Sequence, residues 1–243
     1  LACYCFEHLR QVEFLRMKKA ATGMESICAN AIHSIFPMIC IIGITLFISR
    51  MLFFCFDVHS IHELFSKATC RLFENLNNNF LAGLLYTFLL HLLWFCGFHG
   101  SHLLEPVAQS TFLNVSPGVV FSKSFFDTYV VMGGCGTTIC VLIILLLFYR
   151  HKRIGNLGKI GFFTVIFNLN EILNFGIPIV LNPILGIPFI LTPMACYCIS
   201  YFATATGLVP EFIQQIPWST PILFSGYMAT GSFRGVLLQI VCI

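Results

Sequence analysis

The amino-acid sequence predicts an all-α integral membrane protein, a polytopic helical bundle that includes re-entrant or broken helices. Of its 243 residues, 58% are hydrophobic and only 9% are charged, against roughly 25% charged residues in a typical soluble domain. The mean hydropathy is +0.89. Because a spanning helix needs about 20 apolar residues, the chain has room for roughly five to seven such segments. It leaves no room for a separate soluble domain.

The apolar stretches long enough to span a bilayer are interrupted by few charges. The clearest runs over residues 27–49, which contain no Asp, Glu, Lys or Arg and only His33 as an ionisable group. Further spans are expected at 80–98, 128–149 and 184–209. The stretch 212–230 contains two prolines and is expected to be broken, and 235–243 is short for a span. Residues 1–26 are expected to form a basic interfacial or linker segment, and 27–243 one membrane domain.

The segment 160–190 predicts a re-entrant element instead of a smooth helix. Its apolar residues are interrupted by three asparagines and Glu171, and prolines recur at 178, 183, 188 and 193. Each proline removes a backbone donor. Polar backbone at membrane depth is tolerated only where protein or a water-filled cavity covers it. We therefore expect this segment to line a site.

The basic residues predict the orientation of the chain. Eight of the 13 Lys and Arg lie in residues 7–25 and in a predicted loop, 150–159. Since Lys and Arg accumulate on the cytoplasmic side, both stretches are expected there. Three apolar spans between them cannot return the chain to the same side. The polar stretch 99–127 is therefore expected to add a crossing or a re-entrant hairpin that the protein encloses.

Ionisable residues in apolar segments mark the candidate site, because a charge in hydrocarbon is costly. Glu171 lies among Asn168, Asn170 and Asn174, whose amides could hold its side chain or a hydroxylated ligand. A buried structural anchor is the alternative for Glu171. His99 ends the second span beside a glycine, and its ordinary pKa near 6.5 suits proton exchange.

The two tryptophans, Trp94 and Trp218, could stack on the apolar faces of a sugar, or could anchor the chain at the membrane interface. His33 and His91 are interpreted as packing residues. A metal-dependent membrane enzyme built on His99, His102 and Glu105 is a weaker alternative, since residues three apart share a helix face.

Other functional classes find little support in the sequence. A net charge of +3 is too small for a nucleic-acid surface on so apolar a chain. The 12 cysteines include no CxxC pair, and there is no HExxH, Gly-rich phosphate loop or nucleophile elbow. We therefore expect no nucleic-acid partner, no bound metal and no cofactor.

Several motifs, in order along the chain, resemble those of a known family. Residues 167–194 read FNLNEILNFGIPIVLNPILGIPFILTPM, and this segment resembles the signature region of enzyme IIC, the sugar permease subunit of the bacterial phosphotransferase system. The resemblance is to its lactose, cellobiose and chitobiose family. Four other segments are similar to further motifs of the family. They are HLLWFCGFHG at 91–100, SFFDTYVVMGGCGTT at 124–138, the basic RHKRIGNLGKIG, and GLVPEFIQQIPWSTPILFSGYMATGSFRGVLLQ at 207–239.

The resemblance implies a truncated enzyme IIC fold that corresponds to the C-terminal, sugar-binding half, in the bacterial inner membrane. It implies a multi-pass, homodimeric permease that moves a β-linked disaccharide such as cellobiose, chitobiose or lactose across the lipid bilayer. Phosphate would reach the sugar C6 hydroxyl from a phosphocysteine of a separate enzyme IIB, charged by enzyme IIA, so the chain would not catalyse alone.

By motif, the resemblance places His99 and Glu171 near the sugar and its reacting hydroxyl, and Trp94 and Trp218 against the sugar. Asn170, beside Glu171, is a further candidate for binding the substrate. The residues after Glu171 depart from the family pattern, since Ile172, Leu173 and Asn174 precede Phe-Gly. The alternative within this family is a truncated remnant that keeps the fold but does not transport.

Overall fold

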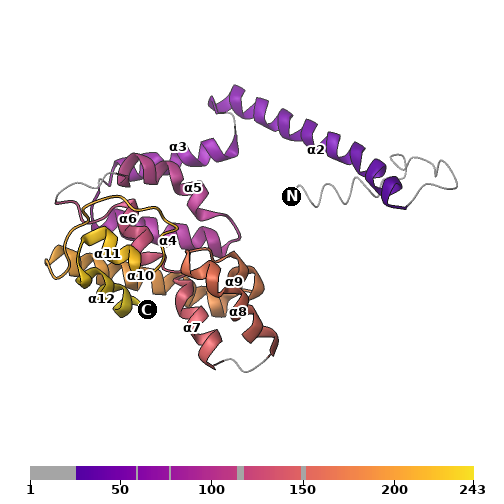
Figure 1. Ribbon diagram of the computed structural model, residues 1–243. Coiled ribbons are helices and arrows are strands. Elements are labelled where there is room, and N and C mark those ends of the chain that lie inside the picture. Colours follow the sequence, from indigo (N-terminus) through magenta and orange to yellow (C-terminus); the bar gives the residue numbers. More distant parts are fainter. Residues whose placement is uncertain (1–25, 59, 77, 114–117, 149–151) are drawn as a thin grey trace. The chain divides into compact units, whose positions relative to one another are not determined.

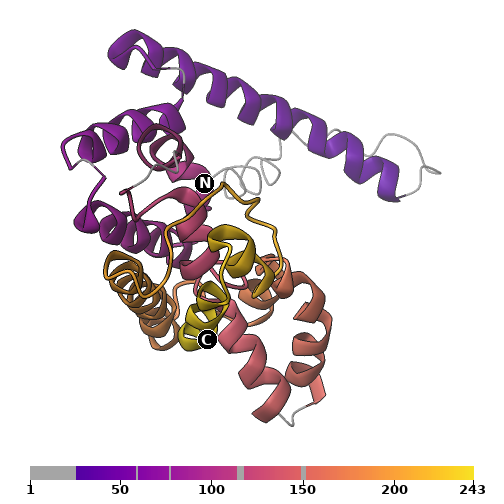
Figure 2. The same ribbon diagram turned by 60° about the vertical axis from the view of Figure 1, so that its left-hand side comes forward.

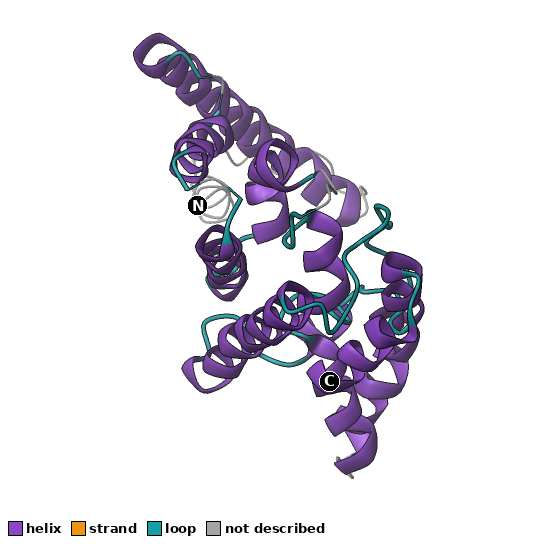
Figure 3. Ribbon diagram, turned by 90° about the vertical axis from the view of Figure 1, so that its left-hand side faces the viewer, coloured by secondary structure: helices purple, strands orange, loops and turns teal. Residues whose placement is uncertain are grey.

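The computed structural model describes residues 26–58, 60–76, 78–113, 118–148 and 152–243. Every regular element in these ranges is a helix, and Figure 3 shows no strand among them, so the all-α prediction is confirmed. The chain divides between Phe65 and Ser66 into two compact units. The predicted segment 1–26 lies almost entirely outside the described residues, and the single membrane domain at 27–243 stays a prediction.

The first unit contains one long apolar helix, α2 (Ser26–Phe56), which includes the stretch 27–49 where a span is expected (Figure 1). Its large side chains are exposed, with Phe47 66% and Phe54 88% accessible. A helix that is apolar on all sides requires a nonaqueous surrounding. Among the described helices, the stretch Pro37–Phe56 of α2 and the helix α10 (Pro183–Ala205) are long and apolar enough to cross a bilayer.

The amphipathic helix α3 (Ile61–Glu74) leads into the second unit, where α4 (Phe80–Phe95) packs against α10. The Asn79 side chain caps α4 by accepting from the Ala82 N–H at 2.9 Å. The Tyr197 hydroxyl of α10 donates to the Phe80 carbonyl at 2.8 Å. The helix ends three residues before the expected boundary at 98, because the chain turns at Gly97, whose φ is 86°.

The polar stretch that follows is partly buried where the structure describes it, and its crossing of the bilayer stays a prediction. It forms the short helices α5 (Gly100–Val107), η2 (Ala108–Phe112), α6 (Lys123–Phe125) and η3 (Phe126–Val130). Leu104, Val107, Phe112 and Phe125 are at most 1% exposed and anchor these helices in an aromatic core.

The continuous span predicted at 128–149 is wrong. The helix η3 ends at Val130, residues 131–137 form a loop, and α7 (Thr138–Phe148) begins after it. The cause is a patch of small residues between Val131 and Thr138. Gly133, Gly134 and Gly136 have φ values of 76°, 100° and 84°, a region that ends a right-handed helix and that glycine enters without steric cost.

The segment after α7 is broken, as predicted. The helix α8 (Lys152–Ile166) packs beside α7, as both Figure 1 and Figure 2 show. Residues 167–170 are not helical, α9 (Glu171–Gly176) is short, and 177–182 separate it from α10. No continuous helix therefore covers 160–190. The loop predicted at 150–159 is corrected, because residues 152–159 form the first half of α8.

The C-terminal part is also divided into irregular chain and short helices. Residues 206–223 are mostly irregular and lead to α11 (Phe224–Thr230), which packs against α12 (Phe233–Cys242). The expectation of a broken element at 212–230 is confirmed. The stretch 235–243, which is expected to be short for a span, lies mostly in α12, a helix of ten residues.

Candidate functional site

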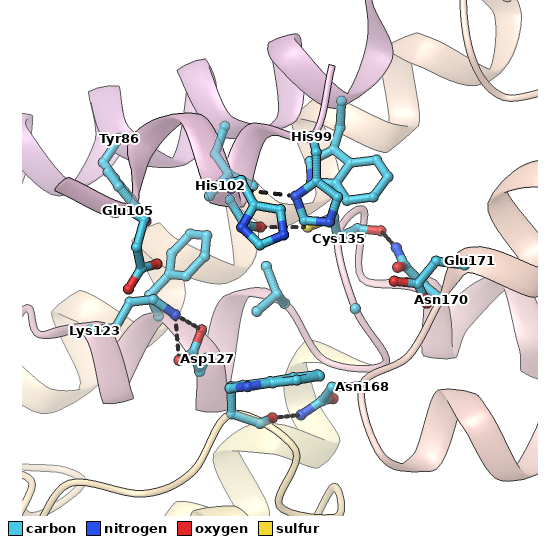
Figure 4. A pocket seen from close by; sticks show the side chains of 17 residues that line it. Tyr86, His99, His102, Glu105, Lys123, Asp127, Cys135, Asn168, Asn170 and Glu171 are labelled. Carbon is cyan, nitrogen blue, oxygen red and sulfur yellow. Dashed lines mark hydrogen bonds and ion pairs between the residues drawn. The ribbon is translucent and has the colours of Figure 1, made fainter. Parts of the chain in front are cut away.

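A cavity of about 340 Å³ lies within the second unit (Figure 4). Its walls come from α4, α5, the α6–η3 turn, the 131–137 loop, the start of α9 and the irregular segment before α11. The volume lies within the range of roughly 300–1,000 Å³ that small-molecule sites occupy. The cavity is therefore built from segments that are far apart in the sequence.

All five residues predicted for the site line this cavity. They are Trp94, His99, Asn170, Glu171 and Trp218. Trp94 is 6% exposed, whereas Trp218 is 53% exposed on the segment before α11. The structure thus brings the two indoles, the imidazole and the carboxylate to one place.

His99 lies in the connection between α4 and α5 and caps the start of α5. Its Nδ1 accepts from the His102 N–H at 3.3 Å, which leaves Nε2 for a ligand. Its ring lies 4.6 Å from that of Trp94, centre to centre. Partial burial lowers the pKa of His99, and the adjacent His102 lowers it further, while Glu171 opposes both effects. The neutral ring, with one donor and one acceptor nitrogen, is favoured.

Asn170 and Glu171 stand at the start of α9. The Asn170 Nδ2 donates to the Cys135 carbonyl at 2.9 Å and to the Thr138 hydroxyl at 3.4 Å, so it fixes the 131–137 loop against α9. Among the described residues, none of the asparagine amides is bonded to the Glu171 carboxylate. Of the two roles expected for these amides, holding the Glu171 side chain is therefore wrong, and binding a hydroxylated ligand stays a prediction. The carboxylate keeps its acceptor sites for a ligand.

Asn168 has a role that the sequence did not indicate. Its Oδ1 accepts from the Gly133 N–H at 2.8 Å, and its Nδ2 donates to the Trp218 carbonyl at 2.6 Å and to the Thr220 carbonyl at 3.4 Å. Its φ of 63° is one that Asn adopts more readily than most residues. Asn168 therefore joins the glycine loop to the segment that carries Trp218. Its place in the asparagine cluster was the available signal.

The metal alternative finds no support in the geometry. The His99 and His102 rings lie 4.1 Å apart, but the His99 Nδ1 is already a helix cap. Glu105 accepts from the Gln109 Nε2 at 3.1 Å and lies away from His99 in Figure 4. Across the part of the chain that the structure describes, no group of three His, Cys, Asp or Glu is placed to hold a metal ion.

Comparison with known proteins decides the family. The model of the family described as Phosphotransferase system, EIIC matches residues 18–193. The chain belongs to this EIIC family. It is 31% identical over 240 residues to the cellobiose-specific EIIC component of Geobacillus stearothermophilus, covering 92% of this chain and 53% of the relative. It is 29% identical over 238 residues to the oligo-beta-mannoside-specific EIIC component of Bacillus subtilis (strain 168), with the same shares of 92% and 53%.

The fold also matches a solved EIIC transporter. The crystal structure of ChbC, the IIC component from the N,N'-diacetylchitobiose-specific phosphotransferase system, has a TM-score of 0.64 and 28% identity to this chain. The match covers 99% of this chain and 58% of ChbC. The chain spans about half the length of the curated relatives named here. The EIIC fold and the phosphotransferase family are thus established for this chain.

Proposed function

We propose that this EIIC chain forms the sugar-binding part of a bacterial inner-membrane permease for a β-linked disaccharide such as cellobiose, chitobiose or lactose. Transport is coupled to phosphorylation of the sugar at C6, with a phosphocysteine of enzyme IIB as the donor and enzyme IIA as the source of its phosphate. The relatives named for cellobiose, oligo-β-mannoside and diacetylchitobiose support the sugar class. The full-length assembly is proposed to be a multi-pass homodimer.

One observation carries the proposal: a single cavity places two indole rings beside a carboxylate and an imidazole. A sugar that leaves water must replace its hydrogen bonds, since a buried polar group without a partner costs about 1–3 kcal/mol. The Glu171 carboxylate and the His99 ring can replace them. Trp94 and Trp218 can cover the apolar faces of the sugar rings.

The same groups suit the chemistry of phosphoryl transfer. In the proposed step, the C6 oxygen forms a bond to phosphorus, the sulfur–phosphorus bond of the donor cysteine breaks, and the hydroxyl proton passes to Glu171 or His99. A base within hydrogen-bond reach assists such a transfer as the proton leaves. Positioning of the reacting oxygen supplies most of the remaining catalysis.

Isothermal calorimetry with purified protein tests the proposal. We expect saturable binding of at least one of cellobiose, chitobiose and lactose, and much weaker binding of sucrose, which has no β-1,4 link. The absence of binding by all three would contradict the proposed function. Binding without formation of phosphorylated sugar in the presence of phosphorylated enzyme IIB would favour the alternative of a non-transporting remnant.

A further inference from the structure

A second group of polar side chains lines the same cavity, away from Glu171. We call it the distal cluster: Tyr86 on α4, Glu105 on α5, Lys123 on α6 and Asp127 on η3. In Figure 4 these four residues lie on one side of the cavity, Asn170 and Glu171 lie on the other, and His99 and His102 stand between them. The cavity therefore has two polar ends.

The centre of the distal cluster is an ion pair. The Lys123 ammonium donates to both oxygens of the Asp127 carboxylate, at 2.5 and 2.6 Å. The two side chains are only 23% and 12% exposed. Removing two charges from water offsets much of their attraction, so such a pair contributes little to net stability. In a membrane protein, ionisable residues that face the interior mark a binding path by default.

The distal cluster also has unused hydrogen-bonding capacity. The Tyr86 hydroxyl is buried and has no partner within the described residues. An ammonium has three donors, and Lys123 directs only two bonds at Asp127. The bond that Glu105 accepts from Gln109 occupies only one carboxylate oxygen. The cluster thus offers both donors and acceptors, which matches the hydroxyl groups of a sugar ring.

The charges around the cavity set a further condition on the ligand. Its lining contains one lysine and three carboxylates, from Glu105, Asp127 and Glu171, so its formal charge is +1 − 3 = −2 with neutral histidines. A carboxylate on the ligand would meet like charges in this cavity. A neutral ring would meet none.

We propose that the distal cluster binds the sugar unit that is not phosphorylated, and that it selects a neutral unit over one that carries a carboxylate. The proposal rests on the proposed function, since it assumes that His99 and Glu171 hold the reacting unit. It makes Lys123 and Asp127 specificity-determining residues of the same site.

The test compares ligands of one and two units by calorimetry on the purified full chain. Methyl β-glucoside represents the reacting unit alone, and cellobiose represents both units. We expect the double variant Lys123→Gln/Asp127→Asn, which removes both charges together, to bind cellobiose at least tenfold more weakly. Its affinity for methyl β-glucoside should change by less than twofold. Lys159→Gln, on an exposed residue of α8, is the matched control and should bind both ligands normally.

Two further measurements separate binding from folding and test the charge condition. Tyr86→Phe removes only the unpartnered hydroxyl, so it should weaken cellobiose binding at least threefold without lowering the melting temperature. Glu105→Gln should bind a disaccharide that carries a C6 carboxylate on its unphosphorylated unit at least fivefold more tightly than the unchanged protein does.

The outcomes distinguish this proposal from the proposed function. Equal loss of affinity for both ligands in the double variant, or unchanged cellobiose binding in both the double variant and Tyr86→Phe, would overturn the distal cluster alone. A failure of the unchanged protein to bind any of cellobiose, chitobiose and lactose would overturn both proposals.

Discussion

Glu171 and Trp218 line the same cavity but offer a ligand different contacts. Glu171→Gln keeps the shape of the side chain and removes its basicity. We expect phosphorylation by enzyme IIB to fall about a hundredfold, at the lower end of what general base assistance supplies, with sugar affinity changed by less than about threefold. The measurement is the rate of sugar phosphate formation beside a calorimetric titration. Equal rates for the variant and the unchanged protein would remove Glu171 from the proposed chemistry.

Trp218→Ala should show the opposite pattern. The substitution removes an apolar ring and no titratable group, so we expect sugar affinity to fall about tenfold, or about 1.4 kcal/mol. Phosphorylation at saturating sugar should change little. Tyr227→Ala, on an exposed aromatic residue outside the cavity lining, serves as the control. A loss confined to the phosphorylation rate would place the indole in the chemical step instead.

Asn168 allows a test of positioning. Asn168→Gly removes three hydrogen bonds, each worth about 0.5–1.5 kcal/mol, while it accepts the φ of 63° without strain. Asn168→Ala removes the same bonds and keeps the strain, which adds about 1 kcal/mol. We expect both variants to bind sugar about tenfold more weakly, and Ala to melt at the lower temperature. Normal sugar binding by Asn168→Gly would show that the Trp218 segment is held by other contacts.

The residues of the site were easier to predict than the way they are held. Glu171 and His99 stand out in the sequence because ionisable groups are rare in this chain. Asn168 and Asn170 look alike in the sequence, yet one anchors the Trp218 segment and the other the glycine loop. Such pairings depend on backbone groups 35 to 50 positions away, which no local pattern encodes.

Among the elements, the 131–137 loop depends on glycine both for its backbone conformation and for its packing. A Cβ at Gly136 would meet the Phe189 ring of α10, in addition to the strain of its φ of 84°. A Cβ at Gly207, with φ of 75°, would meet nothing within 4 Å. We expect Gly207→Ala to destabilise the protein by about 1 kcal/mol through strain alone. Gly136→Ala should destabilise it by roughly 2 kcal/mol or more, because overpacking adds about 1–3 kcal/mol.

Thermal unfolding of the two glycine variants in detergent provides the measurement. Equal melting temperatures would mean that Phe189 moves aside at little cost and that the loop does not depend on this contact. Comparing the two variants therefore separates the cost of packing against Phe189 from the cost of backbone strain, which both substitutions share.

The same loop explains where element prediction failed. Apolar content predicted α2 and α10 well, because a long run without charge has few alternatives in a bilayer. It failed at 128–149, where the residues are as apolar but three glycines adopt positive φ and end the helix. In the 160–190 segment, Asn168 and Asn170 lie in the first break and Pro178 in the second. The other prolines did not indicate a break, because α10 begins at Pro183 and continues through Pro188 and Pro193.

At the scale of the whole molecule, the predicted orientation is open to a direct measurement. Asn156 is an exposed residue in the basic first half of α8, which is expected to face the cytoplasm. We expect a membrane-impermeant maleimide to leave Asn156→Cys unlabelled in intact cells and to label it after permeabilisation. The unsubstituted chain, with its 12 native cysteines, sets the background. Labelling above this background in intact cells would reverse the assigned orientation.

The helix α5 sets the distance between His99, in the middle of the cavity, and Glu105 of the distal cluster. His99 at its cap and Glu105 near its end are six positions apart, or about 9 Å along the axis at 1.5 Å per residue. Removing one residue between them would shorten that gap by only about 1.5 Å but would rotate Glu105 by about 100° around the helix. The carboxylate would then point elsewhere. A change of length in α5 therefore cannot adjust the gap between His99 and Glu105 gradually, because each residue added or removed also turns the carboxylate.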